Sequence, residues 1–171
     1  MLRNLRLMAV ALVIVMTGCS ATSSPVPQTG AAPAVSPYIG ATYPPLPAGW
    51  QDGRAALTAT VGDVQYIVQE MVQANQQMLW FMESTGRNAQ GQFTWVVTDV
   101  LTRSDIKESG SLIWGSCTLN DEPDEEIVAL GERKDGVMEN VQRAWRANHL
   151  TGRFELMTTT GIVCQDEPIG P

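Results

Sequence analysis

A segment rich in proline divides the chain near residue 50 and limits the part that can build a core. Seven of the ten prolines lie within residues 20–49, which are otherwise mostly Ala, Ser, Thr and Gly and carry no charged side chain. Such a composition buries too little apolar surface to offset the entropy of ordering it. We therefore expect residues 19–49 to be a disordered linker of partly polyproline II character. The alternative is that residues 38–47, which include two tyrosines, lie on the domain surface or meet a partner.

The folded part is expected over residues 50–167, with a short tail over 168–171. These 118 or so residues suffice for a self-contained core, and 44% of the whole chain is hydrophobic, which is too much for a fully disordered protein. Segments rich in β-branched and aromatic residues alternate with turn signals. Hairpins are predicted from the pairs 77–85 with 92–102 and 141–148 with 153–158, and further strands over 111–119, 126–132 and 161–165. The sequence thus predicts a mainly β, single antiparallel domain, a meander or a small barrel or sandwich, with at most one or two helices.

Two segments fit more than one kind of element. Residues 64–82 repeat apolar side chains with the 3.6-residue period of a helix, with Asp63 as a candidate N-cap, yet several positions also alternate as in a strand. The alternative fold is therefore α+β with a helix near 64–78, and a turn near Asn75 is expected in either case. Residues 137–148 also fit a short helix, but the hairpin signal that follows them favours a strand.

Residues 1–19 have the layout of an export signal. Arg3 and Arg6 precede an unbroken apolar run over 7–16, which is too short to span a membrane as a helix. Residues 16–19, Met-Thr-Gly-Cys, resemble a bacterial lipobox, although Met16 stands where Leu is more usual.

This resemblance implies a signal peptide over 1–18 and acylation of Cys19, for example with palmitate, as the mature N-terminus. Ser20 follows the cysteine, where Asp would imply retention in the inner membrane. The expected location is therefore the periplasmic face of an outer membrane. The resemblance covers only about 20 residues and implies nothing about the domain.

The charge of the chain argues against two classes of partner. The chain carries 11 Lys and Arg against 18 Asp and Glu, a net charge of −7, and removal of the leader with its two arginines leaves 9 against 18, or −9. Nucleic-acid binding needs a basic face that neutralises phosphate. An acidic chain is also not attracted to anionic lipid. We expect no nucleic-acid partner, and attachment to the membrane through the N-terminal lipid.

Two cysteines remain once Cys19 is assigned to the lipid. Cys117 and Cys164 both lie in predicted strands of an exported domain, where disulfides form and persist. With two cysteines only one intramolecular pairing exists. A pair of reactive thiols is the alternative, but a redox enzyme usually carries a Cys-x-x-Cys motif, and the sequence has none. We therefore predict a structural disulfide that holds the C-terminal strand on the sheet.

Few residues offer catalytic or metal-binding chemistry. His149 is the only histidine and no Gly-x-Ser-x-Gly motif accompanies it, so we interpret it as a solvated loop residue. One histidine and two bridged cysteines do not make a zinc site. The acidic stretch 120–126 is interpreted as an exposed turn, with a weak calcium site as the alternative. No pair of carboxylates is singled out for glycoside hydrolysis. We predict no catalytic residue, metal or cofactor.

The tryptophans and three arginines supply the candidate binding residues. Four of the five tryptophans are expected in the core, whereas Trp50 lies at the linker junction without a clear strand around it. Arg143, Arg146 and Arg153 lie close together along a predicted hairpin, where they are expected to form salt bridges with the acidic loop, or alternatively an anion site. These four residues form the candidate binding surface.

Three functions follow from these features. The first is a non-catalytic binding or envelope-assembly module with a protein or polymer partner, because an anchor, a tether and an acidic domain come without a catalytic constellation. The second is an inhibitor of a basic enzyme such as lysozyme, which an acidic domain would attract by its charge. The third is an envelope hydrolase that uses two carboxylates.

Overall fold

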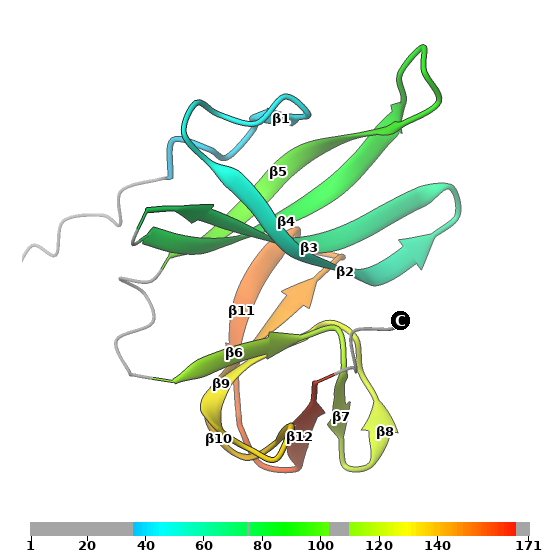
Figure 1. The fold of residues 1–171 in the computed structure, drawn as a ribbon. Helices are drawn as coiled ribbons and strands as arrows, with labels where there is room; N and C mark the ends of the chain where they lie inside the picture. The colour runs from blue at the N-terminus through cyan, green and yellow to red at the C-terminus, as the bar shows by residue number, and fades with distance from the viewer. Residues whose placement is uncertain (1–35, 75, 103–109, 167–171) are drawn as a thin grey trace, which may run out of the picture. The chain divides into compact units, whose positions relative to one another are not determined.

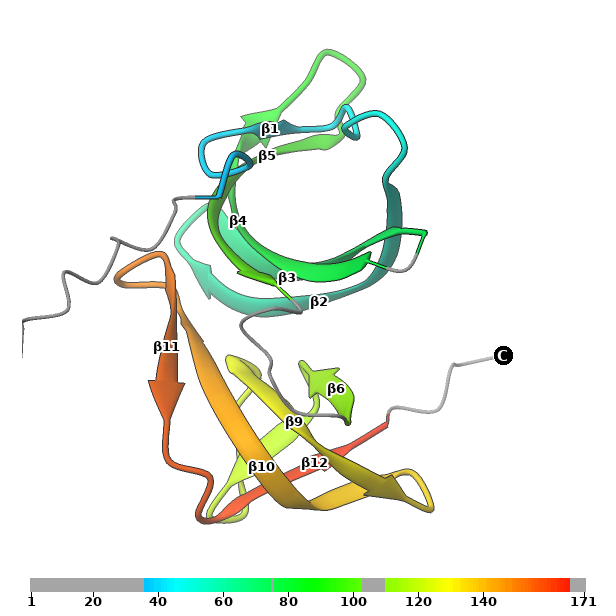
Figure 2. The same cartoon turned by 90° about the vertical axis from the view of Figure 1, so that its left-hand side faces the viewer.

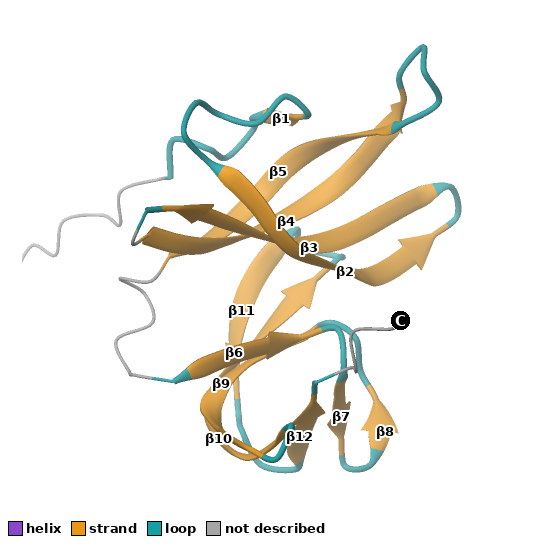
Figure 3. Cartoon of the chain, viewed as in Figure 1, coloured by secondary structure: helices purple, strands orange, loops and turns teal. Residues whose placement is uncertain are grey.

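The computed structural model describes residues 36–74, 76–102 and 110–166, and in these ranges the fold is all-β without a helix (Figures 1 and 3). The strands are β1 (Thr42–Tyr43), β2 (Gln51–Val61), β3 (Val64–Gln73), β4 (Gln76–Arg87), β5 (Phe93–Thr102), β6 (Ser111–Trp114), β7 (Cys117–Leu119), β8 (Glu122–Pro123), β9 (Ile127–Lys134), β10 (Val137–Asn148), β11 (Arg153–Met157) and β12 (Ile162–Gln165). The β-rich fold class is therefore confirmed. The leader and Cys19 lie outside the described residues. None of the described segments is a helix long and apolar enough to cross a membrane.

The first sheet is an antiparallel meander in the order β1-β5-β4-β3-β2. Figure 2 shows that its strands curve strongly around one face. The predicted hairpin of 77–85 with 92–102 is confirmed, since β4 pairs with β5 from Met78↔Thr102 to Arg87↔Phe93. The hairpin could be predicted because its two strands are close in sequence, with a run of five buried apolar residues over 78–82 in β4 and alternating residues at the start of β5.

The helix considered near 64–78 is not formed: residues 64–73 are strand β3, and residues 76–78 begin β4. Strand β3 pairs with β2 on one edge and β4 on the other. Val68 and Met71 are both fully buried, but they belong to hydrophobic clusters on opposite faces of the sheet. A strand that is buried on both faces carries apolar residues at odd and even positions alike, and this spacing imitates the helical period.

The second sheet runs in the order β6-β9-β10-β12-β7-β8. Its long strand β10 pairs with β9 along one edge, and along the other it pairs with β12 near Val137 and with β11 from Ala144 to Asn148. The strand favoured over 137–148, its hairpin with 153–158 and the last strand near 161–165 are confirmed.

The single strand expected over 111–119 is instead two strands. The chain turns at Gly115, which has a φ of 73° that a residue without a Cβ adopts at little cost. As a result β6 pairs with β9, whereas β7 pairs with β12. The predicted disulfide is confirmed, since Cys117 and Cys164 are opposite each other in the β7–β12 register and are joined.

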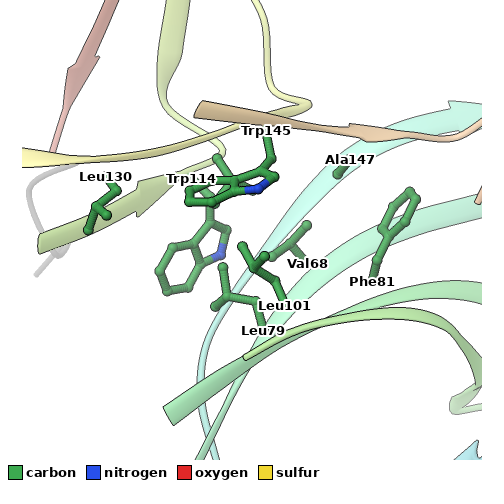
Figure 4. Packing of buried hydrophobic residues seen from close by; sticks show 9 residues of the cluster. Val68, Leu79, Phe81, Leu101, Trp114, Leu130, Trp145 and Ala147 are labelled. Atoms are coloured by element: carbon green, nitrogen blue, oxygen red, sulfur yellow. The ribbon is translucent and has the colours of Figure 1, made fainter. Parts of the chain in front are cut away.

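The two sheets pack through one apolar cluster. Val68, Leu79, Phe81 and Leu101 of the first sheet meet residues of the second, chiefly Trp114, Val128, Leu130, Trp145 and Ala147 (Figure 4). A separate cluster surrounds the disulfide in the second sheet. The third lies on the far face of the first sheet and is rich in tryptophan and methionine.

The linker expected over 19–49 is too long at its C-terminal end. Residues 36–49 belong to the described domain: Thr42 and Tyr43 form β1 against β5, and Tyr38, Tyr43 and Leu46 pack on the third cluster. The apolar surface of these three side chains lets residues 36–49 pack on the sheet, although the Pro-rich segment as a whole offers little apolar surface. The alternative, that residues 38–47 lie on the domain, is the arrangement observed.

Trp50 does not contribute to a binding surface, which corrects that prediction. Its side chain is 8% exposed, and Tyr38 packs edge-on against it with ring centroids 5.8 Å apart. The other four tryptophans are buried as expected. Trp50 is therefore a core residue that joins the N-terminal segment to the first sheet.

Candidate functional site

A polar pocket of about 480 Å³ lies where the β10–β11 turn meets the first sheet. It opens to solvent, and its lining residues are Tyr66, Glu83, Thr98, His149, Leu150, Thr151, Gly152 and Arg153. The first three come from β3, β4 and β5, and the others from the turn and the first residue of β11. A volume of this size accommodates a small ligand.

The floor of the pocket continues a row of core residues. Leu79, Phe81 and Glu83 alternate along β4 on one face, so the strand passes from the inter-sheet core to the pocket within four residues. Tyr66 is directly opposite Glu83 in the β3–β4 register. Burial raises the pKa of the Tyr66 phenol, and the negative charge of Glu83 adds to this effect. The phenol therefore remains a neutral hydrogen-bond donor over the whole neutral range.

The wall of the pocket is a turn organised by Asn148. Its side-chain oxygen accepts a hydrogen bond from the Leu150 N–H at 2.9 Å, and its carbonyl accepts one from the Gly152 N–H at 2.9 Å. A second contact fixes the hairpin on the first sheet, because the Phe154 N–H donates to Asp99 Oδ2 at 2.7 Å. The backbone of the turn is thus held by its own bonds, which fixes where its side chains line the pocket.

An ion-pair network fixes His149 at the rim. Glu126 Oε1 lies 2.5 Å from His149 Nδ1, and Glu126 Oε2 accepts a hydrogen bond from Arg146 at 2.9 Å. Arg146 also pairs with Asp124 at 2.5 Å. The His149 ring lies 5.6 Å from the Tyr66 ring, centroid to centroid. His149 lies in a turn, as predicted, but it is not fully solvated: its side chain is 27% exposed and contacts a carboxylate.

The network shifts the titration of its members. Burial by itself would raise the pKa of Glu126, but the hydrogen bonds from the His149 ring, the His149 backbone and Arg146 outweigh it, and the net shift is downward. The hydrogen bond to Asp124 raises the pKa of Arg146, against an opposing effect of burial. Both groups are therefore held in their charged forms.

The pocket offers an oriented imidazole without an activated nucleophile among its described lining residues. Thr98 donates its hydroxyl hydrogen bond to the Phe81 carbonyl, and the Thr151 hydroxyl lies 2.7 Å from Glu155 Oε1. Neither hydroxyl is engaged with His149. Of the lining residues, Glu83 alone carries a carboxylate, so the lining does not present the pair of carboxylates that glycoside hydrolysis uses.

The three candidate arginines have separate roles. Arg153 lines the pocket, Arg146 forms the expected salt bridges with Asp124 and Glu126, and the guanidinium of Arg143 lies 4.9 Å from the centre of the Trp145 ring. The acidic stretch 120–126, which was interpreted as an exposed turn, is only partly exposed, because the carboxylates of Asp124 and Glu126 are paired with Arg146. No group of three or more His, Cys, Asp or Glu side chains in the described ranges is placed to hold a metal ion.

Sequence reasoning missed Tyr66, Glu83, Thr98 and Glu126 as site residues. A signal existed for Glu83, since it directly continues the apolar row of Leu79 and Phe81 on one face of β4. Nothing local marks the other three. No protein-family model, curated protein or solved structure matches this chain. The function is therefore inferred from the pocket itself.

Replacing Glu126 by Gln tests the network through pH. Because the pKa of Glu126 is below its ordinary value of 4.5 in the folded chain, its stabilisation is complete above that value and is lost as the pH falls through the lowered pKa. We expect Glu126→Gln to lower the free energy of unfolding by about 1.5–3 kcal/mol at neutral pH, the range for hydrogen bonds to charged groups. The measurement is urea unfolding at about pH 7 and about pH 3.

The matched control is Glu139→Gln, which changes an exposed carboxylate on β10. It should leave the unfolding free energy within about 0.5 kcal/mol of wild type. A Glu126→Gln deficit that is equal at both pH values would contradict the ion-pair account, because a loss of packing alone does not titrate.

Proposed function

We propose that this chain is a non-catalytic binding module, tethered through Cys19 to the periplasmic face of an outer membrane, and that the polar pocket is its ligand site. One observation carries the binding role: a phenol, a carboxylate, an imidazole and a guanidinium converge on one open pocket from distant parts of the chain. Concave sites with a few convergent polar groups are the usual ligand sites of proteins.

The architecture around the pocket supports binding rather than catalysis. The His149 imidazole has an orienting carboxylate, but the hydroxyls that line the pocket with it are hydrogen-bonded elsewhere. A nucleophile must be within hydrogen-bond reach of its base to be activated. Positioned donors and acceptors without that contact suit recognition of a ligand.

The proposed tether is the segment between the lipidated Cys19 and the described domain. Residues 20–35 lie between the proposed lipid and the first described residue, and a Pro-rich segment of that length reaches at most about 50 Å. We expect Cys19→Ala to release the chain from the membrane fraction while the domain keeps its fold. Fractionation and circular dichroism check this. Retention of the variant in the membrane fraction would contradict lipid anchoring at Cys19.

The binding role is tested by closing the pocket. Thr151 is exposed on the turn and lines the pocket, so Thr151→Trp should obstruct it without disturbing the core. The matched control is Thr85→Trp on β4, another exposed threonine, which bonds to Thr94 outside the pocket lining. The measurement is equilibrium dialysis of the wild-type chain and both variants against soluble fragments of the cell envelope, with mass spectrometry of what is retained.

We expect the wild type to retain a compound, Thr85→Trp to bind it equally well, and Thr151→Trp to bind it at least about tenfold more weakly. Equal retention by Thr151→Trp would place the ligand elsewhere. Retention of nothing by the wild type would contradict a small-ligand function.

A second function, inhibition of a basic enzyme, is favoured by one part of the surface. Asp121, Glu122 and Glu125 are exposed on the loop around β8, in contrast to their paired neighbours Asp124 and Glu126. Three exposed carboxylates without an ion pair among the described residues would attract a basic protein. Binding to a basic lysozyme that weakens steeply with salt, and that is lost when these three residues are changed to their amides, would support this function.

A further inference from the structure

The pocket contains two open charges of opposite sign. Glu83 and Arg153 both line it, yet within the described part of the chain neither forms an ion pair or a side-chain hydrogen bond, with the other or with a neighbour. Glu83 is half-buried on the sheet, and Arg153 is exposed on the rim. Their charges are therefore available to a ligand.

The other charged groups near the pocket already have hydrogen-bond or ion-pair partners, and the negative charge of Glu155 also interacts electrostatically with Arg153. Glu126 holds Arg146 and His149, Asp124 holds Arg146, and Glu155 accepts hydrogen bonds from Asn148 and Thr151. Among the lining residues, a ligand would thus meet one carboxylate, that of Glu83, and one guanidinium, that of Arg153. Two opposite charges that do not pair with each other can each bind the oppositely charged group of a ligand that carries both.

The surroundings of Glu83 suit an ammonium group. Tyr66 is its cross-strand neighbour, and Cβ atoms of such a pair lie about 5 Å apart, so a cation beside the carboxylate can also contact the tyrosine ring. The phenol can donate or accept a further hydrogen bond. A carboxylate next to an aromatic ring is a favourable combination for a desolvated cation.

The surroundings of Arg153 suit a carboxylate. A guanidinium binds a carboxylate through two parallel hydrogen bonds, which gives direction as well as strength. Arg153 is the first residue of β11 and is opposite Asn148 in the register, so its backbone is fixed by the same turn that holds His149. The positive group therefore has a defined place at the rim, across from the sheet that carries Glu83.

We infer that the ligand of this pocket is zwitterionic, with an ammonium group that binds Glu83 and Tyr66 and a carboxylate that binds Arg153, as in a free amino acid or a short peptide with both ends unblocked. The inference rests on the proposed binding function and names the ligand class of that site. Glu83 and Arg153 thus bind different groups of the ligand, and each contact can be tested without the other.

The test uses the full chain in detergent micelles, three related probes and two isosteric variants. The probes are alanyl-alanine, N-acetyl-alanyl-alanine, which lacks the ammonium, and alanyl-alanine amide, which lacks the carboxylate. Binding is followed by ¹⁵N–¹H chemical-shift changes at the pocket residues. We expect alanyl-alanine to bind about 10- to 100-fold more tightly than either blocked probe, since each block removes one charge-assisted contact.

The variants separate the two charges. Glu83→Gln should bind alanyl-alanine and its N-acetyl form equally, and Arg153→Gln should bind alanyl-alanine and its amide equally. The controls Glu139→Gln and Arg87→Gln change charges outside the pocket lining and should behave as wild type. Circular dichroism confirms the fold of each variant.

Equal binding of all three probes by the wild type would overturn the zwitterion assignment. A neutral disaccharide, N,N′-diacetylchitobiose, distinguishes this failure from failure of the binding function. If it shifts the pocket resonances and alanyl-alanine does not, the pocket is a ligand site but not for zwitterions. If neither probe shifts them at millimolar concentration, the zwitterion assignment is again overturned, and only retention of an envelope fragment by dialysis would sustain the binding function.

Discussion

The Cys117→Ser variant is expected to unfold with a free energy about 4 kcal/mol below that of the wild type. The disulfide joins residues 47 apart, and closing a loop of that size restricts the unfolded chain by about this amount in the chain-entropy model. Cys117 and Cys164 are 3% and 0% exposed, and they pack with Met138 and Ile113 in the cluster of the second sheet. The substitution therefore removes the covalent link and also changes the packing inside this buried cluster.

The effect should be concentrated at the C-terminal strand. β12 is held by three register pairs with β7 and by two with β10, so the bridge contributes a large part of its attachment. The measurement is urea unfolding of wild type, Cys117→Ser and the double variant Cys117→Ala with Cys164→Ala. The double variant removes the bridge without a buried hydroxyl or a free thiol, and should remain about 3–4 kcal/mol less stable than wild type. An unchanged unfolding midpoint, or reaction of both cysteines with a thiol reagent in the native protein, would contradict a structural disulfide.

The Phe81→Ala variant is expected to be destabilised by about 3–5 kcal/mol, the range for truncating a fully buried aromatic residue. Phe81 is 0% exposed and belongs to the inter-sheet cluster (Figure 4). Its ring centroid lies 6.1 Å from that of Tyr66 and 5.6 Å from that of Phe154. Loss of the ring leaves a cavity between the sheets and removes two aromatic contacts, which add to the burial energy.

This substitution should also affect the pocket, because Phe81 supports it from below. Tyr66 lines the pocket, and Phe154 follows Arg153 on β11. The control is Phe93→Ala, at the start of β5, where the ring is only partly buried beneath the Arg87 guanidinium. We expect Phe93→Ala to lower the unfolding free energy by much less, and to leave the chemical shifts of the pocket residues unchanged. Equal destabilisation by both variants would contradict a shared core between the sheets.

Elements formed by neighbouring residues could be predicted from the sequence. The β4–β5 and β10–β11 hairpins are local, and their β-branched and aromatic residues flank short segments with turn residues. The disulfide followed from counting, because only two cysteines remain when Cys19 is assigned to the lipid. In each case the information lies within a short stretch or in a very small set of residues.

Elements whose burial depends on residues distant in the chain could not be assigned from the sequence. β3 kept a helical alternative because burial on both faces hides the strand period, and the second face is supplied in part by residues 36–50. The same contact explains why Trp50 was expected on the surface. The aromatic residues Tyr38 and Tyr43 were the signal that this part of the Pro-rich segment packs on the sheet.

The pocket was beyond sequence reasoning for a similar reason. It unites Tyr66 and Glu83 of the first sheet with a turn of the second, and no local pattern relates them. His149 was weighed as a lone histidine, because its partner Glu126 lies in an acidic stretch whose residues are alike in sequence but not in the fold. The pairing of β9 with β10 brings Asp124 and Glu126 to Arg146 and His149, and this long-range register separates them from the carboxylates that face solvent.

The central claim is that the pocket at the β10–β11 turn is the ligand site. The most direct measurement is a ¹⁵N–¹H spectrum of the full chain in detergent micelles, recorded before and after addition of the envelope fragments retained in dialysis. We expect shift changes centred on Tyr66, Glu83, Thr98 and residues 149–153, and their absence in Thr151→Trp. Changes centred instead on the acidic loop 120–125 or on residues 36–50, with the pocket resonances unmoved, would contradict the central claim.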